Sequence, residues 1–229
     1  MKAAIIVFPG SNCDRDIAVS LEKVTNIKTT MVWHKETSLP DCNLVIVPGG
    51  FTFGDYLRCG SIAANSPIMK DIKKEANKGM PTLGVCNGFQ ILAESGLLPG
   101  TLIKNNCLSF LCKTVSLKVN NCNTKFSNKY SENEIINIPI AHNEGNFFAN
   151  EDTLKEIMDG DQIVFRYCDL EGNINLNSNP NGSIENVAGI INKEGNVLGM
   201  MPQPERATCE STKLTDGEKL FKSIAESLL

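Results

Sequence analysis

The chain has 229 residues, of which 41% are hydrophobic and 21% charged, with a formal net charge of -4. This composition supplies a sizeable core for one α/β domain and is not that of a disordered chain. Nucleic-acid binding needs a clustered basic surface, and the mild acidity, without any Lys/Arg stripe, argues against that function.

The first hundred residues alternate between predicted strands and helices. The apolar run at residues 2–8 is typical of a strand buried on both faces. It is too short for a membrane span, and no small-residue cleavage site follows it, so we expect neither a membrane segment nor a leader here. Further strands are predicted at residues 29–33, 44–47 and 81–85, and helices at 14–23, 66–78 (with Ser66 as N-cap and Pro67 first) and 87–95.

The second half of the chain is richer in predicted strands. These lie at residues 111–119, 135–141, 162–167 and 187–192, and an amphipathic helix is predicted at 215–229. No repeat or linker divides the chain, so we predict a single domain over residues 1–229. Its expected fold is α/β, a mainly parallel twisted sheet with right-handed crossovers and flanking helices, joined by an additional antiparallel strand region.

Nine cysteines and two histidines bear on metal binding and on the cellular compartment. No cysteine pair has CxxC spacing, so we expect no structural zinc site and no other metal site. An odd, scattered set of cysteines indicates a reducing compartment, and we predict a cytoplasmic protein. Most of these cysteines should be small buried side chains with a packing role.

Cys86 has the surroundings of a nucleophile. Gly84-Val85-Cys86-Asn87-Gly88 follows a predicted strand and opens a predicted helix, which is the pattern of a nucleophile elbow. At a helix N-terminus the dipole is expected to lower the pKa of a thiol, and backbone N–H groups can receive an oxyanion. The alternative is a buried cysteine at a tight turn.

Two other glycine-rich turns end predicted strands, Pro9-Gly10-Ser11-Asn12 and Pro48-Gly49-Gly50-Phe51. Ligands of open parallel sheets bind outside the carboxyl ends of the strands, so we expect the three turns to converge on one site. Gly50 could then supply a second oxyanion donor, because glycine permits a backbone that turns an N–H toward a ligand. Alone, this segment would be an ordinary turn.

The elbow motif and four further motifs together resemble the class I (triad) glutamine amidotransferases, and more narrowly the family of glutaminase subunits of phosphoribosylformylglycinamidine synthases of purine biosynthesis. The resemblance implies a flavodoxin-like arrangement of the sheet and covers the chain from the first strand to about residue 206. The residues that carry it are Phe8-Pro9-Gly10-Ser11-Asn12-Cys13-Asp14, Pro48-Gly49-Gly50-Phe51-Thr52-Phe53-Gly54-Asp55-Tyr56-Leu57-Arg58, Gly84 to Gln90, Ile140-Ala141-His142-Asn143-Glu144-Gly145 and Gly199 to Arg206.

The resemblance implies a glutaminase mechanism. Cys86 would attack the side-chain amide of glutamine to give a thioester and ammonia, and water would then release glutamate. Gly50 and Asn87 would donate backbone N–H groups to the oxyanion. Gln90 would help to shape the glutamine pocket, and the His142 segment would lie close to the bound glutamine.

The resemblance also implies partners. Family members pass ammonia to a large synthetase subunit, which uses ATP to convert formylglycinamide ribonucleotide to its amidine, and a small accessory subunit joins the assembly in bacteria. ATP and Mg are expected on the synthetase, with no cofactor in this chain, which has no Walker-type GxxxxGK[ST] loop. Asp55, Tyr56 and Arg58 would either fix the loop after Gly50 or form a docking face for the synthetase.

The chain departs from the family at the triad histidine, where it has Gln203, while Glu205 is present. Glutamine cannot accept a proton near neutral pH, and general-base catalysis is worth roughly 10²–10⁴ in rate. Three explanations stay open: a slow glutaminase in which Gln203 keeps only a hydrogen bond, a base supplied by His142, or a subunit that has lost glutamine hydrolysis and supports assembly. His34 is expected to cap a strand end.

Two alternatives to this function are weighed. One is a different cysteine hydrolase with a similar elbow, although such enzymes lack the Pro-Glu-Arg end and the loop at residues 51–58. The other is the catalytically impaired assembly subunit, with free ammonia feeding the synthetase. Cys13 and Cys59 lie near motif turns but lack the glycine pattern of the elbow, so we expect them to pack. Asp14 and Asp16, in a first helical turn, are expected to be structural.

Overall fold

The computed structural model describes residues 1–229, apart from the side chain of Thr212. A nine-stranded sheet runs through the molecule in the order β2-β1-β3-β4-β11-β10-β9-β6-β7, and β5 pairs with β8 in a second, two-stranded sheet. The strands are β1 (Lys2–Val7), β2 (Lys28–Trp33), β3 (Leu44–Val47), β4 (Thr82–Val85), β5 (Thr101–Ile103), β6 (Leu111–Val119), β7 (Ile135–His142), β8 (Asn146–Phe148), β9 (Ile163–Cys168), β10 (Val187–Ile191) and β11 (Val197–Met200).

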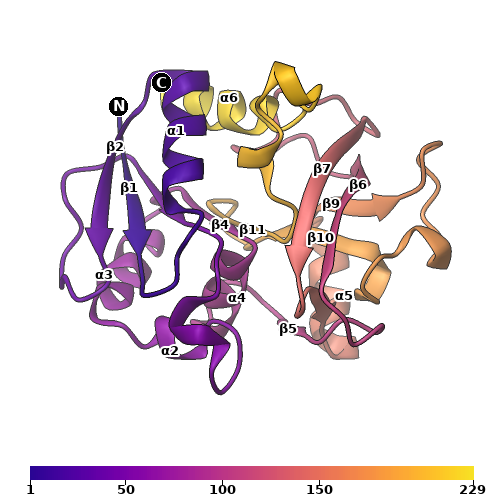
Figure 1. Cartoon of the computed structure of the whole chain (residues 1–229), viewed down its shortest axis with the longest axis horizontal. Helices are drawn as coiled ribbons and strands as arrows, with labels where there is room; N and C mark the ends of the chain where they lie inside the picture. The colour runs from indigo at the N-terminus through magenta and orange to yellow at the C-terminus, as the bar shows by residue number, and fades with distance from the viewer.

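The large sheet has a parallel part and an antiparallel part, as predicted. The five strands from β2 to β11 pair in parallel, and β10, β9, β6 and β7 extend the sheet by antiparallel pairing. Figure 1 shows β1 and β2 in indigo on one side of the molecule and β6, β7 and β9 in pink to orange on the other, with β4 and β11 between them. The carboxyl ends of β1, β3 and β4 therefore point the same way, which is the condition for a shared site.

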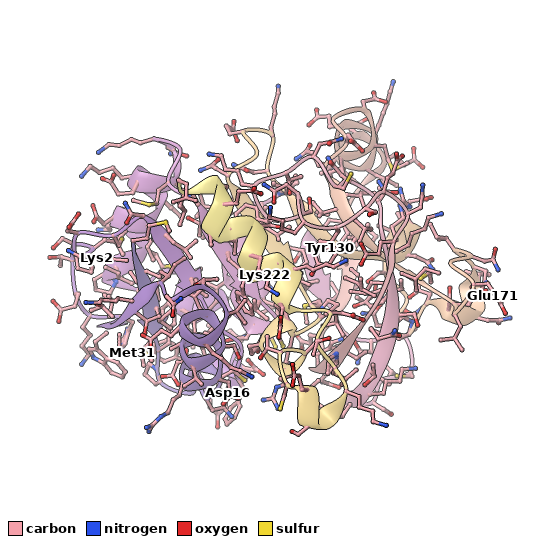
Figure 2. All side chains as sticks on the ribbon, turned by 90° about the horizontal axis from the view of Figure 1, so that it is seen from above. Lys2, Asp16, Met31, Tyr130, Glu171 and Lys222 are labelled. Atoms are coloured by element: carbon pink, nitrogen blue, oxygen red, sulfur yellow. The ribbon has the colours of Figure 1, made fainter. Side chains whose placement is uncertain are left out.

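Helices cover the parallel part. α1 lies beside α6 (Figures 1 and 2), and α4 packs against β3, β4 and β11. Among the described helices, none combines the length and the apolar character needed to cross a membrane. The helices are α1 (Asp14–Thr25), α2 (Ser61–Ala64), α3 (Pro67–Ala76), α4 (Asn87–Glu94), α5 (Glu151–Asp159) and α6 (Glu218–Ser227), with short 3-10 turns η1 (Thr52–Asp55), η2 (Leu176–Ser178), η3 (Ile184–Asn186), η4 (Pro204–Arg206) and η5 (Glu210–Thr212).

The elements predicted from the sequence are all present, and others were not predicted. The helix expected at residues 215–229 begins only at Glu218. The central strand β11 was missed, as were α2, α5 and the pair β5 and β8. β11 contains Gly199, where a side chain would place its Cβ 2.2 Å from the Phe89 ring of α4. This close approach holds α4 against the sheet and so fixes the helix that begins at Cys86.

Candidate active site

Cys86 occupies a strained turn between β4 and α4. Its φ of 52° and ψ of -110° lie in a region that residues with a side chain rarely adopt. A Cβ on Gly84 would lie 2.5 Å from Leu92 of α4, and one on Gly88 would lie 1.8 Å from the Val47 carbonyl oxygen of β3. Glycines on both sides of Cys86 are therefore required by the close packing of helix and strands, as the elbow pattern predicts.

The three glycine-rich turns converge at this edge of the sheet. Phe51 N donates to the Gly10 carbonyl over 3.0 Å, which joins the first turn to the second. A Cβ on Gly49 would lie 3.4 Å from Cys86 Cβ, so the second turn also lies against the elbow. The sequence prediction of one shared site is confirmed.

Two backbone N–H groups are available near the thiol. The Asn87 N–H points at the Cys86 sulfur and acts to lower the pKa of the thiol. Gly50, with a φ of 147°, lines the same cavity, and within the described chain its N–H donates to no acceptor. These groups have the disposition of oxyanion donors.

The side chains of Asn87 and Gln90 hold the surrounding loops in place. Asn87 Oδ1 accepts from Thr52 N over 3.1 Å, and Asn87 Nδ2 donates to Gln90 Oε1 over 2.8 Å. Gln90 Nε2 donates in turn to the Glu144 carbonyl over 2.6 Å. The elbow helix is thereby tied both to the loop after Gly50 and to the loop after β7.

A cavity of about 260 Å³ opens over the thiol. It is slightly smaller than pockets for drug-sized ligands, which suits a small metabolite such as an amino acid. In the described chain no group of three or more His, Cys, Asp or Glu side chains is arranged to hold a metal ion. The cavity is lined by Asn12, Cys13, Gly50, Phe51, Asp55, Cys59, Cys86, Gln90, Phe110, Ala141, His142, Asn143, Glu144, Gln203 and Arg206.

The Cys86 thiol is protonated at rest. Its sulfur lies 3.5 Å from the Ala141 carbonyl oxygen, to which the thiol donates. Burial, and then the negative charge of Glu205, raise the pKa of Cys86 to about 12. The expectation of a lowered thiol pKa was wrong, because loss of solvent outweighs the Asn87 N–H and the helix N-terminus.

Gln203 and Glu205 lie beneath the thiol, and both are buried. Gln203 N donates to the Pro139 carbonyl over 2.8 Å, and Ser20 Oγ donates to the Glu205 carbonyl over 2.9 Å, so β7 and α1 fix the segment. The Gln203 side chain forms a hydrogen bond with the Cys86 sulfur that acts to lower the thiol pKa. Burial raises the pKa of the Glu205 carboxyl to about 7.

His142 lines the cavity in a defined tautomer. Its Nδ1 lies 3.0 Å from Asn105 Oδ1, which also accepts from Gly145 N, while Asn105 Nδ2 donates to the His142 carbonyl. Asn105 therefore presents its oxygen to the ring, so Nδ1 carries the hydrogen and Nε2 is a bare acceptor. Burial lowers the pKa of His142 to about 4, which makes it a weak base at neutral pH. These features favour the pocket-shaping role for His142.

The remaining candidates fall outside the reacting centre or on its wall. His34 follows β2, donates its N–H to the Val7 carbonyl and does not line the cavity, in agreement with a strand-capping role. Cys13 and Cys59 are buried, yet both line the cavity wall. Asp16 of α1 forms an ion pair of 3.5 Å with Arg206.

Sequence reasoning did not single out Asn105 or the carbonyl of Ala141. Asn105 lies outside every motif, and its partner His142 is 37 residues further along the chain, so no local pattern could have found it. Ala141 lies within a quoted motif, but a backbone carbonyl leaves no signature in the side chains. Arg206 was part of a motif, and its contact with Cys13 over 3.4 Å was not expected.

A parallel sheet edge with a strained cysteine elbow, two backbone N–H groups beside the thiol and a small cavity defines a glutamine amidotransferase-like site. The chain belongs to the CobB/CobQ-like glutamine amidotransferase domain family, whose model matches residues 1–222. The resemblance drawn from these motifs is confirmed.

Relatives match over their whole length. The phosphoribosylformylglycinamidine synthase subunit PurQ of Synechocystis sp. is 52% identical over 96% of this chain and 98% of its own. That of Acaryochloris marina is 48% identical over 100% of this chain and 97% of its own. A chain in the structure of PurLQS from Thermotoga maritima is 41% identical and superposes with a TM-score of 0.89, covering 100% of this chain and 99% of that one.

Proposed function

We propose that this chain is the glutaminase subunit of a phosphoribosylformylglycinamidine synthase and hydrolyses glutamine to glutamate and ammonia for purine biosynthesis. The observation that carries the proposal is Cys86, exposed to a small cavity from a strained elbow between two N–H donors. Full-length similarity to PurQ subunits gives the reaction its setting.

The proposed reaction proceeds through a thioester. The Cys86 sulfur bonds to the side-chain amide carbon of glutamine, and the N–H groups of Gly50 and Asn87 receive the oxyanion. The carbon–nitrogen bond then breaks, and the nitrogen leaves as ammonia with the proton given up by the thiol. Water hydrolyses the thioester, which releases glutamate and restores the Cys86 thiol.

Other side chains are proposed to bind and position. Gln90 and His142 shape the glutamine pocket, a role supported by their place on the cavity wall and their fixed hydrogen bonds. Gln203, at the usual histidine position, contributes a hydrogen bond to the sulfur rather than a base, and Glu205 acts through Gln203. A cysteine withstands such a loss better than a serine, because thiols are intrinsically strong nucleophiles.

The ammonia is proposed to pass to a synthetase subunit, with a small accessory subunit completing the complex. The name of the Thermotoga maritima assembly, PurLQS, and the fit of its chain to this one support these partners. ATP and Mg would act on the synthetase, and the complex would be cytoplasmic. We also propose that residues 1–229 act as one domain, since strands from both halves of the chain belong to one nine-stranded sheet.

The alternatives weighed from the sequence are not carried forward. The match to the CobB/CobQ-like glutamine amidotransferase family argues against a different cysteine hydrolase with a similar elbow. The comparisons give no support to the catalytically impaired assembly subunit, since relatives bearing the subunit name match over full length.

The test is covalent labelling with a chloroketone analogue of glutamine, followed by mass spectrometry of the intact chain and its peptides. We expect one label per chain, on Cys86, and protection by glutamine. Cys86→Ser should remove the label. Cys168→Ala is the matched control, a buried cysteine outside the cavity, and should label as the wild type does. A label on another cysteine, or none, would contradict the mechanism.

A further inference from the structure

Three buried oxygen atoms beneath the thiol have no hydrogen-bond partner in the described chain: Gln203 Oε1 and both carboxyl oxygens of Glu205. Gln203 is 2% exposed and Glu205 5%, so both side chains lie away from bulk solvent. All three are acceptors when the carboxyl is ionised, so they cannot bond to one another. Each unsatisfied buried acceptor carries a desolvation penalty, which is larger for a charged group.

No cation is placed to hold Glu205 as an ion. The Arg206 guanidinium is engaged elsewhere, at 3.5 Å from Asp16 and 3.4 Å from Cys13. Burial disfavours the charged form of the carboxyl most strongly. Its own backbone N–H and Arg206 favour the charged form, and Asp16, Cys13 and Cys86 disfavour it when ionised. β7 and α6 pack against η4, but in the described chain neither adds a charge that acts on Glu205. A single proton on this carboxyl would remove the buried charge.

We propose that Glu205 carries a proton in the resting protein and donates it in a hydrogen bond to Gln203 Oε1, which turns the Gln203 amide nitrogen toward the Cys86 sulfur. One proton satisfies two of the three orphan oxygens, and the remaining one is a neutral acceptor. Glu205 is then a positioning residue for Gln203. This inference rests on the proposed role of Cys86 as the nucleophile.

With glutamine at position 203 the site requires a neutral Glu205, whereas a histidine at that position would require an ionised Glu205. A histidine at position 203 would need an ionised Glu205 beside it to stabilise the imidazolium that forms when it takes a proton. The amide of Gln203 takes no proton, so an ionised Glu205 only opposes the thiolate through its negative charge. A neutral Glu205 supports the amide and leaves the thiolate free of that repulsion.

A four-variant cycle tests this reversal, using the full chain as wild type, Glu205→Gln, Gln203→His and the double variant. The measurement is the rate of Cys86 alkylation by iodoacetamide between pH 6 and 9, which covers both the protonated and the ionised state of Glu205 and does not depend on glutamine. Glu205→Gln is permanently neutral and keeps a donor for Gln203 Oε1, so the rate should stay the same or rise. In the Gln203→His protein, Glu205→Gln removes the carboxylate that stabilises the imidazolium. This change should slow alkylation about 10- to 1,000-fold. Slowing by the same factor in both backgrounds would overturn the proposal.

The ionisation of Glu205 gives a second readout that does not depend on the reactivity of any variant. Isotope-edited infrared spectroscopy, with Glu205→Gln as the difference reference, should show a protonated carboxyl that titrates near pH 7 in the wild type. In Gln203→His the same carboxyl should titrate below its ordinary pKa. A wild-type carboxyl ionised from about pH 4 upward would overturn the proposal. Failure of the chloroketone label with a carboxyl that titrates near pH 7 would reject the glutaminase function and leave this inference standing.

Discussion

The Cys86 thiol of the elbow donates to the carbonyl oxygen of Ala141 on β7, 3.5 Å from the sulfur. This contact joins the parallel part of the sheet, which ends in the elbow, to the antiparallel part that walls the cavity. The resting nucleophile is thus a neutral thiol held against an acceptor, and its activation must begin with loss of that hydrogen bond.

The pH dependence of Cys86 reactivity follows from its raised pKa of about 12. Because only the thiolate reacts, alkylation should quicken about tenfold for each pH unit above pH 8, where Glu205 has finished titrating. The rate, corrected for the other thiols with Cys86→Ser, should still be rising at pH 10. A plateau reached below pH 9 would mean that the elbow lowers the pKa after all.

Restoring the histidine should speed glutamine hydrolysis. Gln203→His places a base beside the thiol and above Glu205, and we expect glutamate release by the assembled complex to increase by about 10²–10⁴. Gln203→Met is the control, because it has similar length and cannot donate to the sulfur, so it should be slower than the wild type. No gain in Gln203→His would show that another group already takes the proton from Cys86.

β1, β3 and β4 could be predicted from the sequence because each is a short apolar run close to a proline. β3 and β4 are buried along their whole length and are bounded by Pro48 and Pro81. β11 is as short as β3 and β4, and its Gly199 serves packing against Phe89 rather than strand formation. Its parallel neighbour β4 is far away in the chain, and local patterns carry no information about such pairing.

For the site too, part could be predicted from the sequence and part could not. Cys86, Gly50, Gln90 and His142 could be predicted because glycine spacing and motifs mark them. The charge state of the site could not, since it depends on how completely Glu205 is buried and on where Arg206 points. Helix position alone indicated a lowered thiol pKa, and only the packed structure shows that desolvation dominates.

Gly88 is expected to be essential to the elbow. Alanine in a helix is usually about 1 kcal/mol more stable than glycine, but at this position its Cβ would lie 1.8 Å from the Val47 carbonyl oxygen. Gly88→Ala should therefore lower the free energy of unfolding by about 2–3 kcal/mol, measured by urea denaturation. Gly96→Ala, with a φ of +78° and open space around it, should cost only about 1–2 kcal/mol. Equal losses in the two variants would show that the Val47 contact yields easily.

Glu205 and His142 should give opposite contributions to the pH dependence of stability. The pKa of Glu205 is raised from 4.5 to about 7, so the folded state binds the extra proton between these values, and this contribution is lost as pH rises through 7. The pKa of His142 is lowered from 6.5 to about 4, so the unfolded state binds the extra proton in that range, and this contribution is lost as pH falls. Each shift corresponds to about 3 kcal/mol, and the two largely cancel between pH 4.5 and 6.5.

Single variants should reveal the separate contributions of Glu205 and His142 to the pH dependence of the free energy of unfolding. Relative to the wild type, Glu205→Gln should lose stability as pH falls from 7 to 4.5, because it no longer gains from binding the proton. His142→Asn, whose amide can still donate to Asn105, should gain relative stability over the same fall, since the unfolded state no longer takes up a proton there. Urea unfolding of the three proteins at several pH values measures both differences. Slopes of the same sign would be inconsistent with a protonated Glu205 and a neutral His142 sharing this cavity, because only opposite pKa shifts make the two variants diverge.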